Sequence, residues 1–297
     1  AGVDDHFVII SSEGEVAIYK GTDPASSATF ELHGVYFAGK PLGNRCFAKF
    51  GGDLVILTET GVITLGKLLG GQSSNYNGAL TSLIDGAFAE AVRYYKDNFG
   101  WLCVVYPLQN ALIVNIPTTN SVSIQFVMNT ITGAWCSFSG WSALTMLVFG
   151  DNLYYTTNTK VVKAWTGKND FGNDITATCQ QAYNYLGNRG VVKQFKLVRP
   201  IIEFDYSIRL ELGIDVDFDD RTTYNETLIP RGNSSLWDSA EWDEAVWGAD
   251  TIIEDNWRMV DSKVGYAVAL RMRIKTKTSL VRWAAVDIIW ERGGIFS

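Results

Sequence analysis

The chain has 297 residues, of which 47% are hydrophobic and 19% charged; this excludes an intrinsically disordered protein and allows one large or two ordinary domains. Its formal net charge of −7 excludes a basic surface that grips nucleic acid through clustered Lys and Arg. An aromatic content of 13% with only 6 prolines favours a fold rich in strands and hairpins.

Short apolar strands joined by tight turns are predicted throughout the first half of the chain. The strand pairs lie at 7–11 with 16–19, 46–50 with 53–58, 101–106 with 111–116, and 151–156 with 161–165, and a further strand lies at 30–37. Matching strands begin at Phe7, Leu54, Leu102 and Leu153, a repeat of about 48 residues that is typical of β-propeller blades.

The visible repeats are few for a propeller, because propellers usually carry about 4–8 blades. Two interpretations stay open: the remaining blades precede Ala1, or the units form a curved partial stack. An opening without a methionine or a leader favours a fragment or a processed product.

Two segments stand out within this half. The stretch 126–141, FVMNTITGAWCSFSGW, predicts a β-hairpin with its turn at 129–133. Apolar residues in 77–99 recur at helical spacing, which predicts an inserted amphipathic helix. The helix packs either on the edge of a blade or on a neighbouring subunit.

The character of the sequence changes after the polar segment 168–174, so we predict a β-propeller-like domain at 1–170 and a β-sandwich at 171–297. Longer strands are predicted at 194–203, broken by Pro200, and at 264–276 and 280–290. Residues 208–218 alternate strictly between apolar and polar, as expected of a half-buried antiparallel strand.

No residue pattern indicates catalysis or a cofactor. The 4 cysteines have neither redox nor zinc-ligand spacing, and their apolar neighbours favour buried free thiols over a disulfide. The 2 histidines, His6 and His33, have no Ser, Cys or Asp arrangement that marks a catalytic triad. No apolar run approaches the roughly 18 residues of a membrane span, so we predict none.

Two clusters remain as candidate sites. Asp215, Asp217 and Asp219 form a candidate acidic face, which either holds a hard cation such as calcium or is simply solvated. In 236–248, LWDSAEWDEAVWG, three tryptophans recur at intervals of five residues, which fits neither one helix face nor one strand face. These candidate subunit contacts either plug into a neighbouring protein or pack on their own domain: Trp237, Trp242 and Trp247.

Several of these segments together resemble the tail nozzle (tail tubular) proteins of short-tailed bacteriophages, the podoviruses. The resemblance covers most of the chain from about Gly51 onward and rests on strand and turn patterns: GDLVILTETGVITL, FVMNTITGAWCSFSGW, DNLYYTTNTKVVKAWTG, QAYNYLG, VRPII, LWDSAEWDEAVWG and LVRWAAVDIIWERGG. It implies a propeller-bearing subunit of a ring, expected to be a hexamer, below the portal and head-to-tail adaptor. It also implies a lumen through which double-stranded DNA is ejected.

We therefore expect a non-enzymatic virion protein without cofactor or metal, made in the host cytoplasm and assembled with the adaptor and other tail proteins. The acidic balance agrees with transient DNA passage without specific binding, since Lys and Arg contacts to phosphates would slow it. The alternative is a carbohydrate-binding or carbohydrate-cleaving β-propeller module for host-surface recognition. A third reading is a propeller scaffold that binds only proteins.

Overall fold

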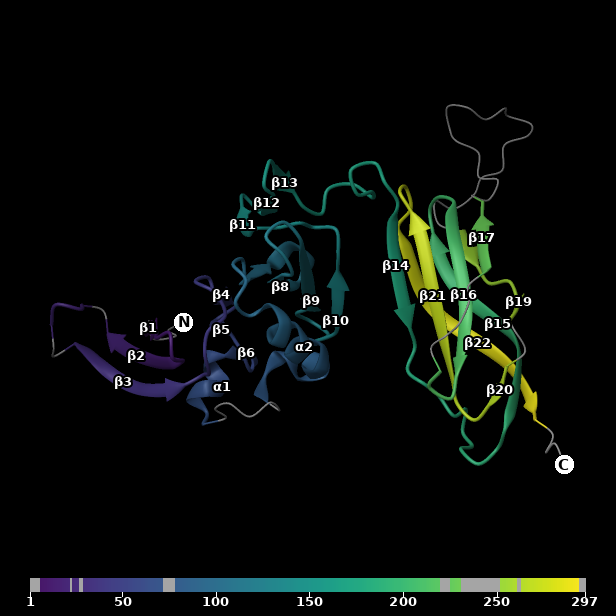
Figure 1. Cartoon of the computed structure of the whole chain (residues 1–297), viewed down its shortest axis with the longest axis horizontal. Coiled ribbons are helices and arrows are strands. Elements are labelled where there is room, and N and C mark those ends of the chain that lie inside the picture. Colours follow the sequence, from purple (N-terminus) through teal and green to yellow (C-terminus); the bar gives the residue numbers. More distant parts are fainter. Residues whose placement is uncertain are drawn as a thin grey trace. The chain divides into compact units, whose positions relative to one another are not determined.

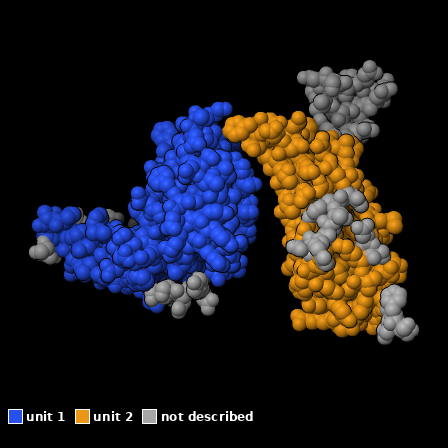
Figure 2. All heavy atoms as spheres, in the orientation of Figure 1, with its two compact units in different colours: residues 1–166 blue, residues 167–297 orange. Residues whose placement is uncertain are grey.

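The computed structural model describes residues 6–21, 23–26, 29–71, 78–219, 225–230, 252–260 and 263–293. Most of its regular structure is antiparallel strand, so the prediction of an all-β fold is confirmed. The chain divides into two compact units, Ala1–Thr166 (unit 1) and Gly167–Ser297 (unit 2), coloured blue and orange in Figure 2. Each unit has its own hydrophobic core.

Unit 1 contains four small sheets whose strands follow one another in space as they do in the chain. Sheet 1 comprises β1 (His6–Ile10), β2 (Glu15–Gly21) and β3 (Phe30–Phe37), and sheet 2 comprises β4 (Phe47–Phe50), β5 (Asp53–Thr58) and β6 (Gly61–Thr64). Sheet 3 comprises β7 (Leu102–Tyr106), β8 (Ala111–Pro117), β9 (Ser123–Asn129) and β10 (Trp135–Phe138), and sheet 4 comprises β11 (Thr145–Phe149), β12 (Asn152–Thr156) and β13 (Val161–Lys163). The predicted hairpin at 126–141 corresponds to β9 and β10.

The four sheets pack face to face in a row, with one core between each pair of neighbours. Val16 and Ile18 of sheet 1 meet Ile56 of sheet 2. The opposite face of sheet 2 packs against sheet 3, and the opposite face of sheet 3 packs against sheet 4. Sheets 2 and 3 are therefore covered by apolar neighbours on both faces.

Short helices fill the gaps beside this row. Helix α1 (Leu65–Leu69) adds to the core between sheets 1 and 2, and α2 (Asp85–Tyr95) adds Phe88, Ala91 and Val92 to the core between sheets 2 and 3. A 3₁₀ turn, η2 (Leu80–Ile84), precedes α2, and a second one, η3 (Pro107–Gln109), joins β7 to β8. The helix predicted at 77–99 is therefore shorter than its periodic pattern, and it packs on the sheets of its own chain.

The first strands of successive sheets also touch one another. Strand β4 lies beside β7, and β7 lies beside β11. Arg45 joins all three sheets, because its carbonyl oxygen accepts a hydrogen bond from the Cys103 N–H at 3.4 Å and its guanidinium donates to the Thr145 hydroxyl at 2.5 Å. The row is thus fastened along one side by backbone and side-chain contacts.

Unit 2 consists of two sheets packed face to face. Sheet 5 has the order β14 (Ile175–Gln180), β21 (Val268–Thr276), β16 (Ile208–Val216) and β17 (Asn225–Ile229). Sheet 6 is built around β15 (Lys193–Phe204), which pairs with β18 (Ile252–Glu254), β19 (Arg258–Met259), β20 (Val264–Gly265) and β22 (Val281–Arg292). Figure 1 shows β15 and β22 as the long strands of this sheet.

Sheet 6 corrects the prediction that Pro200 breaks its strand. Pro200 lies inside β15 and is paired with Val286 of β22. On the other side of β15, β19 pairs as far as Val198 and β18 pairs from Ile202, so Pro200 falls in the gap between them. A strand tolerates proline where no ladder bond requires its N–H, and this gap provides such a place.

Candidate assembly surfaces and the cleft between sheets 1 and 2

Sheet 1 leaves one of its two faces uncovered. Cross-strand pairing places Phe7 opposite Tyr19, Tyr19 opposite Leu32, and Glu15 opposite Phe37. The open face of sheet 1 is formed by the side chains of Phe7, Ile9, Glu15, Tyr19, Leu32, Val35 and Phe37. Phe7 and Val35 are each 57% exposed, and Phe37 is 52% exposed. Isolated exposed apolar residues are ordinary, but a contiguous face of them marks a binding surface.

Sheet 4, at the other end of the row, has an uncovered face of the same kind. Met146 and Leu153 point into the core shared with sheet 3, so the alternate residues point outward. The open face of sheet 4 is formed by the side chains of Thr145, Leu147, Phe149, Tyr154, Val161 and Lys163. Leu147 is 61% exposed and Phe149 72% exposed. Figure 1 shows sheet 1, in purple, and sheet 4 in different parts of unit 1.

Continuous apolar runs in the sequence indicate these surfaces, although the same strands also fit the hairpin pattern. The strand FVII in β1 and the strand MLVF in β11 are continuous apolar runs, like LVIL in β5. Such a run is typical of a strand that is covered on both faces. In β5 both faces are covered, whereas in β1 and β11 one face remains exposed.

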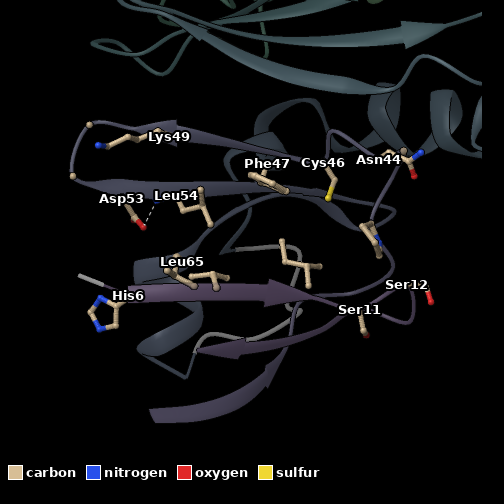
Figure 3. Close-up of a pocket in the computed structure, with 16 residues that line it drawn as sticks. His6, Ser11, Ser12, Asn44, Cys46, Phe47, Lys49, Asp53, Leu54 and Leu65 are labelled. Atoms are coloured by element: carbon tan, nitrogen blue, oxygen red, sulfur yellow. Dashed lines mark hydrogen bonds between the residues drawn. The ribbon is translucent and has the colours of Figure 1, made fainter. Parts of the chain in front are cut away.

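A cleft of about 890 Å³ is lined by residues of β1 and β4, by the start of β5 and by the loops that precede β2 and β4. Figure 3 shows His6, Lys49 and Asp53 at one end of the cleft and Ser12 and Asn44 at the other. The lining is mixed polar and apolar.

Asp53 and His6 are two polar residues of this cleft whose contacts are defined. Both carboxylate oxygens of Asp53 accept the Gly66 N–H, at 3.1 and 3.2 Å, and Oδ1 also accepts the Leu54 N–H at 2.7 Å. His6 faces the ring of His33 at a centroid distance of 6.1 Å. Asp53 therefore acts as a structural cap on the backbone that follows β6.

The cysteines divide into two classes, which corrects the prediction that all of them are buried. Cys46 and Cys103 are buried, whereas Cys136 and Cys179 are exposed, and all four are free. Cys103 has its pKa raised to about 12 by burial and by the neighbouring Cys46. Since the thiolate is the reactive form, the buried pair is chemically inert at neutral pH.

We predict that a thiol reagent at neutral pH modifies the two exposed cysteines first in the folded chain, although partial burial also raises the pKa of their thiols, and all four cysteines after denaturation. Alkylation followed by peptide mass spectrometry is expected to find the label on Cys136 and Cys179 and not on Cys46 or Cys103. Rapid labelling of Cys103 in the folded chain would contradict the packing of sheets 2 and 3.

The three aspartates of the candidate acidic face do not share one face. Asp215 lies on β16, fully buried, and accepts hydrogen bonds from Arg271 Nε at 2.9 Å and Gln180 Nε2 at 2.7 Å. Strand β16 ends at Val216, and Asp217 has a left-handed φ of 51°. Its Oδ1 accepts the Tyr266 and Ala267 N–H groups, each at 2.8 Å. Among the described residues, no three His, Cys, Asp or Glu side chains gather as metal ligands.

Asp215 instead belongs to a ladder of cross-strand ion pairs between β16 and β21. The ladder lies on the outer face of sheet 5, which is the face that points away from sheet 6. Glu211, also on β16, accepts hydrogen bonds from Lys275 Nζ at 2.6 Å and Arg273 Nη1 at 3.1 Å. The hydrogen bond from Lys275 is the main cause that lowers the pKa of Glu211 below its ordinary value, and the nearby positive charges add to it. The ladder fixes the register of β16 against β21.

We predict that acid weakens unit 2 through Glu211. Because its folded pKa is lowered, the ionised carboxylate contributes stability above its unfolded pKa of about 4.3, and this contribution is lost as the pH falls through the folded value. Glu211→Gln is expected to lower the free energy of unfolding by about 1.5–3 kcal/mol at pH 7 and to flatten its dependence on pH below about 4.5. Urea unfolding followed by circular dichroism between pH 3 and 7 measures both effects.

Glu203→Gln is the matched control for this prediction. Glu203 pairs with an Arg282 that is 77% exposed, at 3.4 Å, and exposed ion pairs contribute about 0–1 kcal/mol. An equal acid response in the two variants would contradict the assignment to Glu211.

The tryptophan-rich segment with Trp237, Trp242 and Trp247 lies outside the described residues. Asp219 is described; its N–H donates to the Val216 carbonyl at 3.0 Å in the turn after β16. None of the described helices has the length and apolar character needed to cross a bilayer.

No protein-family model matches this chain, and no curated protein matches it.

Proposed function

We propose that the chain is a structural subunit of a short-tailed phage tail, a nozzle or tube subunit that attaches below the portal and adaptor and surrounds the path of the ejected DNA. It is proposed to act in the virion as part of a hexameric ring, after synthesis in the host cytoplasm. The four sheets of unit 1 serve in this proposal as propeller blades, and unit 2 as a β-sandwich.

The observation that carries the proposal is the pair of open apolar faces on sheets 1 and 4. No described residue of unit 1 covers these faces, and burial of apolar surface is worth about 25 cal/mol per Å². A subunit of a larger assembly covers such faces with its neighbours. The motif resemblance then selects the tail nozzle among the possible assemblies.

The charge of the chain supports the same proposal. A net charge of −7 gives an electrostatic repulsion toward DNA, and a conduit needs weak contact with the phosphates that pass it. In unit 2, the arginines of the outer face of sheet 5 are paired with carboxylates, as Arg271 is with Asp215, and so are occupied within the chain.

The experiment is assembly of the purified chain on the portal–adaptor complex of a short-tailed phage, followed by electron microscopy. We expect six-fold rings below the adaptor with a central hole wide enough for duplex DNA, and no rings on portals that lack the adaptor. A chain that ignores the adaptor and binds bacterial surface glycans would overturn the proposal and favour the carbohydrate-binding alternative.

A further inference from the structure

The strongest unexplained feature of unit 1 is that no described residue of this unit continues the packing of sheet on sheet beyond sheet 1 or beyond sheet 4. Sheet 1 on sheet 2, sheet 2 on sheet 3 and sheet 3 on sheet 4 are three successive contacts between apolar sheet faces. Each contact uses one face of each sheet. The row therefore ends with one unused apolar face on sheet 1 and one on sheet 4.

The two unused faces carry opposite charges within apolar surroundings. Glu15 lies on the open face of sheet 1, beside Phe37, and Lys163 lies on the open face of sheet 4, beside Tyr154. Neither side chain forms an ion pair with another residue in the described part of the chain. A contact between these two faces would bury apolar area and bring a carboxylate toward an ammonium group.

We propose that the open face of sheet 1 packs against the open face of sheet 4 of a second copy of this chain. The contact continues between subunits the same face-to-face step that joins the sheets within one subunit. Because it uses two different surfaces of the same molecule, it is a head-to-tail contact, which forms a ring if its rotation closes and an open filament if it does not.

Two other occupants drawn from the described residues fit the observations less well. The two faces do not cover each other within one chain, since Val35 remains 57% exposed and Leu147 61% exposed. Pairing of the open face of sheet 1 with its own copy would bring two Glu15 carboxylates into one contact without a cation from either face. Like charges in one interface oppose association.

This inference rests on the part of the proposed function that makes the chain a subunit of an assembly, and it adds the surfaces that join the subunits. It does not depend on the adaptor or on DNA. Self-association through these faces together with failure to bind the adaptor would contradict the proposed nozzle function and support the contact between subunits. Binding of the adaptor by a chain that never self-associates would support the nozzle function and contradict the contact between subunits.

The test uses one blocking charge on each face. Val35→Glu blocks the open face of sheet 1, and Leu147→Glu blocks the open face of sheet 4. Both side chains are more than half exposed, so the substitutions leave the cores intact. Ile131→Glu is the control, because Ile131 is 76% exposed in the turn between β9 and β10 and belongs to neither face.

Sedimentation velocity over a range of concentrations is expected to show self-association of the unmodified chain and of Ile131→Glu. Each blocked variant alone is expected to associate at least about tenfold more weakly. An equimolar mixture of the two blocked variants is expected to give a one-to-one pair, because each keeps the face that the other has lost. Formation of that pair also demonstrates that both variants are folded.

Exchange of the charges supplies an independent result. Glu15→Lys and Lys163→Glu are each expected to weaken association, and the two substitutions together are expected to restore it. Three results would each overturn the proposed contact: an unmodified chain that stays monomeric, strong self-association of Leu147→Glu alone, or a mixture of the two blocked variants that stays monomeric.

Discussion

Replacement of Trp101 by alanine is expected to lower the free energy of unfolding of unit 1 by about 3–5 kcal/mol, the range for removal of a large buried aromatic side chain. Trp101 is 2% exposed and lies in the core between sheets 2 and 3. Its indole N–H donates to the Tyr95 carbonyl at 2.8 Å, at the end of α2, and its ring meets Phe88 edge to face at 6.4 Å.

The backbone around Trp101 has little room to collapse into the cavity that alanine would leave. Gly43 approaches so closely that a Cβ on it would lie 2.6 Å from the Trp101 carbonyl oxygen, and its φ of +72° is one that glycine adopts freely. The Tyr95 carbonyl would lose one of its two donors and keep the Asn98 N–H at 3.0 Å. The close packing alone places the expected loss in the upper part of the range.

Hydrogen exchange followed by mass spectrometry in increasing urea measures this loss unit by unit. Trp257→Ala is the matched control, because Trp257 is 42% exposed and its ring contact is with Arg199 of unit 2 at 5.1 Å. We expect this control to cost about 0.5–1 kcal/mol and to leave exchange in unit 1 unchanged. Equal losses in the two variants would show that Trp101 does not anchor α2 to the sheets.

Replacement of Lys193 by methionine is expected to lower the free energy of unfolding of unit 2 by about 2–4 kcal/mol. Lys193 is fully buried, which is rare for lysine. Its ammonium group donates to the carbonyl oxygens of Asn188 at 2.6 Å, Val191 at 2.9 Å and Tyr266 at 3.1 Å, and it lies 5.5 Å from the centre of the Trp290 ring.

Methionine keeps the volume of the lysine stem and removes all three donors. The carbonyl oxygens would then be left without these partners, and a buried unsatisfied polar group costs about 1–3 kcal/mol. Arginine is expected to fail as well, because its planar fork matches paired acceptors rather than three carbonyls that converge on one point.

Urea unfolding of Lys193→Met is compared with that of Lys196→Met on the same strand. Lys196 is 40% exposed and pairs at the surface with Glu291 at 2.5 Å, so its loss is expected to cost no more than about 1 kcal/mol. A Lys193→Met variant as stable as Lys196→Met would show that the three carbonyls find other donors.

The sequence predicts well those elements whose signal is local. The hairpins at 7–19 and 126–141 are recognised because apolar and β-branched runs flank turn residues that are close in the chain. Strand β14 is not recognised, because it lies at an edge with every residue exposed and lacks alternation. Strand β11 is not predicted, because the repeat of about 48 residues falls on β12, the strand that follows it.

Other features depend on residues that are distant in the sequence. The burial of Lys193 is set by Tyr266 and Trp290, and no local pattern announces it. The alternation in 208–218 extends past the end of β16, where Asp217 turns away to hold the backbone at Tyr266. The open faces are similar: an apolar run shows that a strand has two apolar sides, but the order of the sheets decides which side stays uncovered.

The pairing of β15 with β22 has a consequence for synthesis of the chain. In sheets 1 to 4, paired strands follow one another directly, so each sheet can form soon after its residues leave the ribosome. Strand β15 instead waits for a partner that includes Asp287, which lies 88 residues beyond the Arg199 it binds. During that delay its unpaired edge is available to other nascent chains, so misassembly during production is expected to begin in unit 2.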